Sequence, residues 1–352
     1  TADVLPFQHV LVHEKLHMVL PIVHQPQNAD GAGGDIEIFL HIRRVGEGQA
    51  RHAELLRQVL GLEDLLPFQH EQVELRLLPV AEENIKRLTE KLGVELHVEK
   101  MNWDEMREMQ LAWFRTGLEM LDAPQDHAFI ALIDKYSREL GVKYILNGYN
   151  ISTEIIADPE SWEKGSGPTG DGTFMRDVIK KYCSIPIKNY TFTNGFKHKF
   201  WIPYVLGVKT IKPLNLVPIT KEKMIQTLSE EYGYVPYGQK HFEDLLTKFL
   251  EGWWTPTRFG HDIRRAQLSS LVVTGQMTRE EALEILSKPP ITEDESKALF
   301  TEVAKRLEIS EEELMALHDM PECTDKFKSQ EKIYALGIKL YEILGIEKRI
   351  RK

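Results

Sequence analysis

The sequence predicts an α/β protein with a parallel sheet, followed by a mainly helical region. From Glu82 onward, apolar periodicity indicates the order helix, strand, helix, helix, strand, and parallel strands need crossovers of this kind. Beyond about Pro218, three helix starts carry Ser or Thr with Glu three residues later, which is typical of capping boxes. We therefore divide the 352 residues into an α/β part, 1–217, and a mainly helical part, 218–352.

Composition excludes several classes of protein. The 42% hydrophobic content excludes a disordered chain, and two cysteines cannot form a disulfide scaffold or a cysteine-based zinc site. A run of 18 apolar residues is absent, so we expect no transmembrane helix. The net charge of −10 argues against broad duplex nucleic-acid binding, although a local basic patch remains possible. We expect a cytoplasmic protein with no nucleic-acid or membrane partner.

The elements of the α/β part follow from local patterns. Ile85, Leu88 and Leu92 share a helical face that Gly93 ends, and Asn102 with Glu105 marks the start of the next helix. Met106, Met109 and Trp113 have core spacing on that helix. We predict strands over 35–42, 73–80, 94–101 and 142–146, helices over 53–60, 127–140 and 174–182, and a long loop over 159–172.

The two ends of the chain have features of their own. Residues 1–80 are atypical because they hold seven of the thirteen histidines, which we interpret as ordinary side chains rather than metal ligands. The segment 330–352 is amphipathic, and packing on its own domain is favoured over an oligomer contact. Its apolar face is formed by Ile333, Leu336, Leu340 and Leu344.

The best local candidate for a site follows the strand 142–146. Ligands of open α/β sheets bind beyond the carboxyl ends of the strands. Gly148 allows close approach to the backbone, and Asn150, Thr153 and Glu154 supply groups for a base, a phosphate, a ribose or a metal. The alternative is that Asn150 and Thr153 only cap a helix.

A second candidate opens the helix predicted at 127–140. Free N–H groups at a helix start favour an anion, and the neighbouring Asp126 and His127 suit acid–base chemistry. The alternative is that Asp126 only caps the helix.

A third candidate is the stretch 237–270, in which aromatic, acidic and basic residues interleave. Arginine suits bidentate recognition of phosphate or carboxylate, so this stretch fits an anionic sugar nucleotide. A solvated helix face with salt bridges explains the composition equally well. The stretch includes Lys240, His241, Asp262, Arg264 and Arg265.

Six ordered segments between about 83 and 290 resemble the N-acetyl sugar amidotransferase family. These enzymes belong to the PP-loop ATP pyrophosphatase group, so the resemblance implies a Rossmann-like, adenine nucleotide alpha hydrolase-like sheet. The segments are 124–127 (PQDH), 144–154 (YILNGYNISTE), 212–215 (KPLN), 237–243 (YGQKHFE), 259–266 (FGHDIRRA) and 269–282 (SSLVVTGQMTREEA).

The resemblance implies a specific reaction in bacterial lipopolysaccharide or other surface-glycan biosynthesis. ATP with Mg²⁺ would adenylate the acetamido group of a nucleotide-linked sugar, and ammonia from a separate glutaminase would then give an acetamidino group. It also implies that residues 1–217 bind the nucleotide and that residues 218–352 contact the substrate or another copy in a homo-oligomer. The implied roles are catalysis for Asp126, His127, Lys240 and His241, ATP binding for Gly148, Asn150, Thr153 and Glu154, and substrate binding for Asp262, Arg264 and Arg265.

The sequence departs from the family at its phosphate loop, Ser-Gly-Gly-x-Asp-Ser. Residues 45–50 (VGEGQA) stand in its place, Glu47 would oppose pyrophosphate, and the family's early paired cysteines are missing. Divergence, a local reading-frame change and a variant mode of phosphate binding remain open. The second functional hypothesis is therefore a catalytically inactive member that binds sugar nucleotides or partners in an assembly. A third, tRNA thiolation, is disfavoured by the acidic charge.

Overall fold

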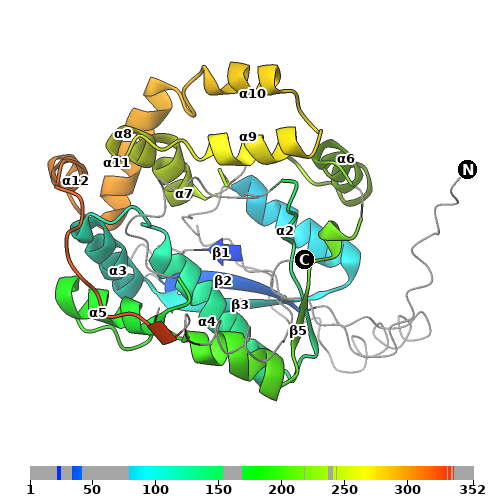
Figure 1. The fold of residues 1–352 in the computed structure, drawn as a ribbon, viewed down its shortest axis with the longest axis horizontal. Helices are drawn as coiled ribbons and strands as arrows, with labels where there is room; N and C mark the ends of the chain where they lie inside the picture. Colours follow the sequence, from blue (N-terminus) through cyan, green and yellow to red (C-terminus); the bar gives the residue numbers. More distant parts are fainter. Residues whose placement is uncertain are drawn as a thin grey trace, which may run out of the picture.

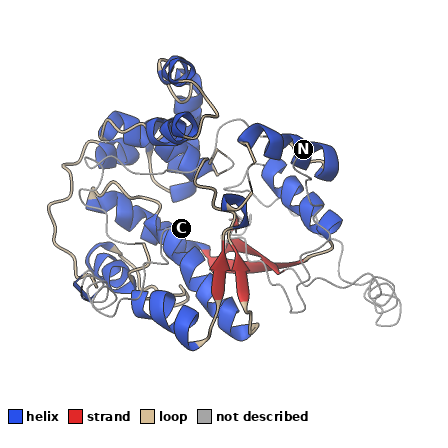
Figure 2. Ribbon diagram, turned by 45° about the vertical axis from the view of Figure 1, so that its right-hand side comes forward, coloured by secondary structure: helices blue, strands red, loops and turns tan. Residues whose placement is uncertain are grey.

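The computed structural model describes residues 22–24, 34–41, 79–153, 169–217, 219–236, 241–242, 244–330, 332–333 and 336. Over these residues the protein is mainly helical, with strands at its centre (Figures 1 and 2). The described strands form two small sheets rather than one continuous sheet. None of the described helices has the length and apolar character needed to cross a bilayer.

The first sheet contains β1 (Ile22–His24), β2 (Gly34–His41) and β3 (Glu95–Asn102) in that order. Both pairings are antiparallel, with Ile38 opposite Val98 between β2 and β3. The predicted strands 35–42 and 94–101 are thus present within one residue of their expected bounds. The expectation that the strand 94–101 joins 142–146 in one parallel sheet is wrong, because β3 pairs antiparallel with β2. Alternating apolar residues identify a strand without specifying the direction of its neighbour.

The second sheet pairs β4 (Tyr144–Leu146) with β5 (Lys209–Ile211) in parallel. The connection passes through α5 (Gly172–Tyr182) and the π-helix η4 (Lys197–Val205), as a parallel pair requires. This pair confirms the parallel prediction for the strand 142–146. A complete Rossmann-like sheet is not seen in the described part of the chain.

The core is built around α3 (Trp103–Thr116), which packs against α4 (Ala123–Glu139) and α5. The predicted core residues Met106, Met109 and Trp113 are all buried. The predicted cap is also confirmed, because Asn102 Oδ1 accepts a 3.0 Å hydrogen bond from the Glu105 N–H.

Two acidic residues of α3 hold the chain that follows α5. The Glu105 carboxylate is buried and accepts hydrogen bonds from the backbone N–H groups of Lys188, Asn189 and Tyr190. Glu108 accepts from the Ser184 N–H at 2.6 Å. The chain leaving α5 is therefore fixed before it reaches η4.

The segment before α3 differs from its prediction. Pro79 and Val80 begin α2 (Pro79–Leu92) instead of ending a strand over 73–80, and proline is favoured in the first turn of a helix. The remainder of that predicted strand and the predicted helix 53–60 lie outside the described residues.

The C-terminal part is helical, as predicted, and all three capping boxes form, at Thr278, Thr292 and Ser310. In the amphipathic tail, Ile333 and Leu336 are exposed, whereas Leu340 and Leu344 lie outside the described residues. Packing of the tail is therefore not seen at its described positions. The helices are α6 (Lys221–Tyr232), α7 (Leu245–Phe249), η6 (Leu250–Trp254), α8 (Thr255–Arg258), α9 (Arg264–Val273), α10 (Arg279–Leu286), α11 (Glu293–Leu307) and α12 (Glu311–His318).

Candidate functional site

The segment that follows β4 is a structured turn. The Asn147 N–H donates to the Ile211 carbonyl at 2.8 Å, which extends the β4–β5 pairing. Asn150 is buried, and its Oδ1 accepts hydrogen bonds from both the N–H and the hydroxyl of Ser152. Asn150 therefore stabilises a turn in residues 151–153 rather than a described helix, while Gly148 is exposed.

A second segment, after β5, meets this turn. The Ile151 N–H donates to Asn215 Oδ1 at 2.8 Å, and Lys212 Nζ lies 4.0 Å from the centre of the Tyr149 ring. Asn215 belongs to the short 3₁₀ helix η5 (Pro213–Asn215). The two segments thus converge at the carboxyl ends of two parallel strands, where α/β proteins commonly bind ligands.

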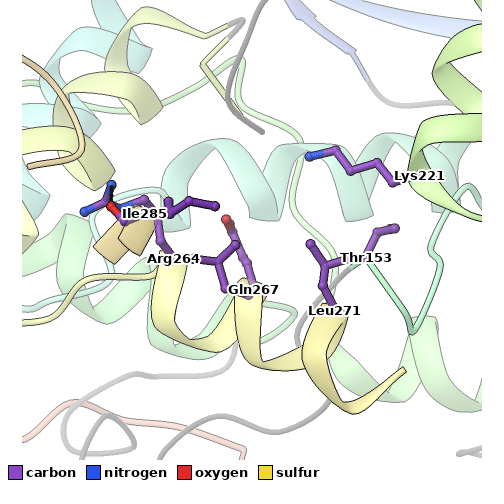
Figure 3. A pocket seen from close by; sticks show the side chains of 7 residues that line it. Thr153, Lys221, Arg264, Gln267, Leu271 and Ile285 are labelled. Atoms are coloured by element: carbon purple, nitrogen blue, oxygen red, sulfur yellow. Dashed lines mark hydrogen bonds between the residues drawn. The ribbon is translucent and has the colours of Figure 1, made fainter. Parts of the chain in front are cut away.

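A small cavity lies beside this turn (Figure 3). Its volume of about 100 Å³ accepts one group of a ligand, since whole small-molecule sites have volumes of roughly 300–1,000 Å³. Thr153 connects the cavity to the strand-end turn. The other residues lining it are Lys221, Arg264, Gln267, Leu268, Leu271 and Ile285.

Gln267 is the polar group of most interest in the cavity. Its side chain rises from α9 between Arg264 and Leu271, with Lys221 on the opposite side (Figure 3). The residue is only 8% exposed, and its Nε2 has no hydrogen-bond partner in the described part of the protein. A buried amide without a partner is costly, so a ligand oxygen in the cavity would satisfy it.

Arg264, a predicted substrate ligand, is engaged within the protein. Its Nε and Nη2 bind the two oxygens of Asp262 at 3.0 and 2.7 Å, and Nη2 also donates to the Lys288 carbonyl. In Figure 3 the guanidinium points away from Lys221 and Thr153. The Asp262–Arg264 pair thus ties the start of α9 to the end of α10, while Arg265 is exposed.

Two predicted catalytic residues, Asp126 and His241, influence one another electrostatically. Burial raises the pKa of the Asp126 carboxyl to about 6, and the charge of His241 opposes part of that rise. His241 Nδ1 lies 2.8 Å from Glu251 Oε1, and the backbone of His241 is left-handed, which is uncommon for residues other than glycine. Such a pair suits proton transfer near neutral pH.

His127 has the contacts of a core residue instead. It is fully buried, its Nδ1 contacts the Thr169 carbonyl at 2.5 Å, and its Nε2 accepts from the Thr193 N–H. Burial is the main cause that lowers its pKa, and this favours the neutral form of the ring. Neither ring nitrogen is left for a reacting group, so the structure does not support the predicted catalytic role of His127. Asp126 is not the helix cap either, because α4 begins after Asp122.

The sequence interpretation overlooked two residues, Glu251 and Gln267, although both lie in its third candidate stretch. Glu251 Oε2 is buried without a hydrogen-bond partner among the described residues. Gln267 follows Arg264 by three residues, and this spacing places both side chains on the same face of a helix. The spacing therefore indicates Gln267 as a neighbour of a predicted site residue. Lys240 and Glu154, two predicted site residues, lie outside the described residues. The described part contains no group of three or more His, Cys, Asp or Glu suited to a metal ion.

Part of the chain matches a known protein family. Residues 243–341 match the family described as LPS biosynthesis protein WbpG-like, C-terminal domain. The search of curated proteins finds no match. The matching region includes Glu251, Arg264 and Gln267, and it lies within the predicted helical part 218–352. Over these residues the chain is similar to the C-terminal domain of WbpG-like proteins, and this similarity indicates a role in lipopolysaccharide or glycan biosynthesis.

Proposed function

We propose that this protein is an ATP-dependent amidotransferase that converts the acetamido group of a nucleotide-linked sugar to an acetamidino group. The observation that carries the proposal is the meeting of the turn after β4 with the segment after β5, joined by Ile151 and Asn215. Both segments belong to the motifs that resemble the family. The similarity of residues 243–341 to a lipopolysaccharide biosynthesis domain supports a sugar nucleotide as the substrate.

The proposed reaction has two steps. The amide oxygen of the substrate attacks the α-phosphorus of ATP and pyrophosphate leaves, because an amide oxygen is otherwise a poor leaving group. Ammonia then adds to the activated carbon, AMP leaves, and a base accepts the proton that ammonia releases. Asp126 and His241 are the groups whose environment suits this proton transfer. ATP would bring Mg²⁺, with Glu154 as the proposed ligand.

The cysteines support an external source of ammonia. A glutaminase of the cysteine type needs a reactive thiolate. Burial raises the pKa of the Cys183 thiol to about 12 and also raises the pKa of Cys323. These are the two cysteines of the chain, so the proposal assigns glutamine hydrolysis to a separate protein.

The test supplies ATP, Mg²⁺, ammonium and a nucleotide-linked acetamido sugar, and measures AMP, pyrophosphate and the mass of the sugar product. We expect AMP and amidine in equal amounts, and no AMP with the sugar nucleotide that carries a free amine. The absence of ATP binding in calorimetry with Mg²⁺ present would contradict the proposal.

The second candidate function is a non-catalytic, sugar-nucleotide-binding member of an assembly. The sequence VGEGQA at 45–50, in place of the phosphate loop, favours it. It predicts that the sugar nucleotide binds while AMP is never formed. If the wild-type protein forms AMP faster than the Asp126→Asn variant does, this alternative is excluded.

A further inference from the structure

One outward face of η4 is unusually rich in exposed aromatic residues. Phe196, Phe200, Trp201, Tyr204 and Val205, which we call the aromatic face, are each between 42% and 59% exposed. The rings of Phe196 and Phe200 stack with centres 5.1 Å apart, and Phe200 and Tyr204 follow at 5.8 Å. These three rings therefore form a continuous row that begins at the N-cap residue of η4 and runs along the helix.

The opposite side of η4 is fixed to the protein. Ile202 is buried in the core, and His198 Nδ1 lies 2.9 Å from the fully buried Asp134 carboxylate of α4. The Lys197 N–H donates to Asn194 Oδ1 at the start of the helix. These contacts anchor η4 to the protein core, so the aromatic face is exposed on an anchored helix.

The chain segment that carries this face is strongly biased in charge. From Val178 to Lys221 the chain contains eight lysines and no aspartate or glutamate, although the whole chain has a net charge of −10. Lys199 lies on η4 itself and is exposed, as are Lys188 before it and Lys209 after it. The segment that displays the aromatic rings is therefore also the basic segment.

We propose that the aromatic face of η4 docks on a membrane surface that contains anionic lipids. Apolar rings beside lysines are the pattern of helices that lie in the membrane interface, where rings enter the acyl boundary and ammonium groups contact lipid phosphates. This revises the expectation of no membrane partner, because such a helix lies on a bilayer and does not cross it. Docking there would bring the enzyme close to a membrane-bound stage of glycan assembly.

Two other occupants fit the face less well. Proteins that bind nucleic acid commonly use arginine and aromatic rings on which the bases stack. Residues 178–221 contain no arginine, and the rings of Phe196 and Phe200 already stack on each other. A second copy of the chain in a two-fold dimer would bring lysines of like charge together.

The experiment is sedimentation of the full chain with vesicles of phosphatidylcholine alone or with added phosphatidylglycerol. We expect binding only to the anionic vesicles, weakening as salt is raised. Phe200→Ser with Trp201→Ser should weaken binding by about tenfold or more, since both rings lose their contact with the acyl boundary. Lys197→Glu with Lys199→Glu should abolish it. These positions are at least partly exposed, and far-UV circular dichroism confirms folding.

Leu283→Ser is the matched control, because Leu283 is 53% exposed on α10, which lies across the molecule from α4 in Figure 1. It should leave vesicle binding unchanged. Equal sedimentation of the wild type and both double variants would overturn the proposal. A second outcome would also overturn it. In that outcome the Phe200 and Trp201 substitutions abolish RNA binding, or a dimer seen by light scattering, but leave vesicle binding intact.

Discussion

The side-chain oxygen of Asn215 accepts a 2.8 Å hydrogen bond from the Ile151 N–H. The two residues are 64 positions apart, and each follows one strand of the parallel β4–β5 pair. This contact holds two chain segments in one place at the carboxyl edge of the sheet. It gives the proposed ATP site a defined geometry that separate motifs in the sequence do not have.

Asn215→Ala should therefore weaken ATP binding more than it weakens the fold. The lost hydrogen bond is exposed, so we expect about 1 kcal/mol less stability in urea denaturation. The freed turn should reduce ATP affinity by about tenfold, measured by calorimetry. Asn215→Asp keeps an acceptor oxygen and is the control for stability. An unchanged ATP affinity in Asn215→Ala would contradict the assignment of this edge to ATP.

Asp126 makes the stability of the protein depend on pH. The pKa of its carboxyl is about 6 in the folded protein and 3.8 in the reference state, because burial disfavours the charge. Between pH 4 and pH 6 the unfolded chain loses this proton while the folded chain keeps it, so the free energy of unfolding should fall as pH rises. Asp126→Asn should remove that fall. Asp104→Asn, at an exposed position of α3, is the control and should retain it.

The same carboxyl should govern the reaction rate if it acts as the base. Activity should rise as pH increases through about 6, where Asp126 becomes charged. Asp126→Asn should lower kcat by about 100-fold or more. A steady-state pH profile measures both effects. If the Asp126→Asn variant keeps the wild-type kcat and its activity still rises as the pH increases through about 6, Asp126 is not the base.

Glu105 should contribute strongly to stability. Its buried carboxylate accepts backbone hydrogen bonds from residues 188–190, and those N–H groups would lose their partner in Glu105→Ala. We expect a loss of about 3 kcal/mol in urea denaturation. Glu308→Gln removes an exposed carboxylate that pairs with Arg107 and should cost less than about 1 kcal/mol. Similar losses in both variants would show that the Glu105 contacts contribute little.

Glu105 also shows where prediction from sequence stops. Local signals identified the Asn102 cap, the buried face of α3 and all three capping boxes, because each depends on residues within one or two helical turns. The contact between Glu105 and the chain 83 residues later has no local signal. The antiparallel direction of β3 and the burial of Gln267 likewise depend on tertiary contacts.

Gln267→Leu should separate binding from stability. The Gln267 Nε2 is buried without a partner in the described protein, so replacing the amide should leave the free energy of unfolding unchanged or slightly higher. If the cavity holds a substrate oxygen, the same variant should raise KM for the sugar nucleotide by about tenfold. Gln226→Leu, at an exposed position of α6, is the control and should change neither. An unchanged KM would exclude the cavity from substrate binding.

Arg264→Lys should destabilise the helices that form this cavity. The guanidinium of Arg264 is buried, and it bridges both oxygens of Asp262 and the Lys288 carbonyl, so it needs the forked geometry that lysine lacks. We expect a loss of about 2 kcal/mol in urea denaturation, and a higher KM because α9 and α10 line the cavity together. Arg265→Lys, at the exposed neighbouring position, should leave both quantities unchanged. A raised KM at wild-type stability would instead show that Arg264 binds the substrate directly, as the sequence first suggested.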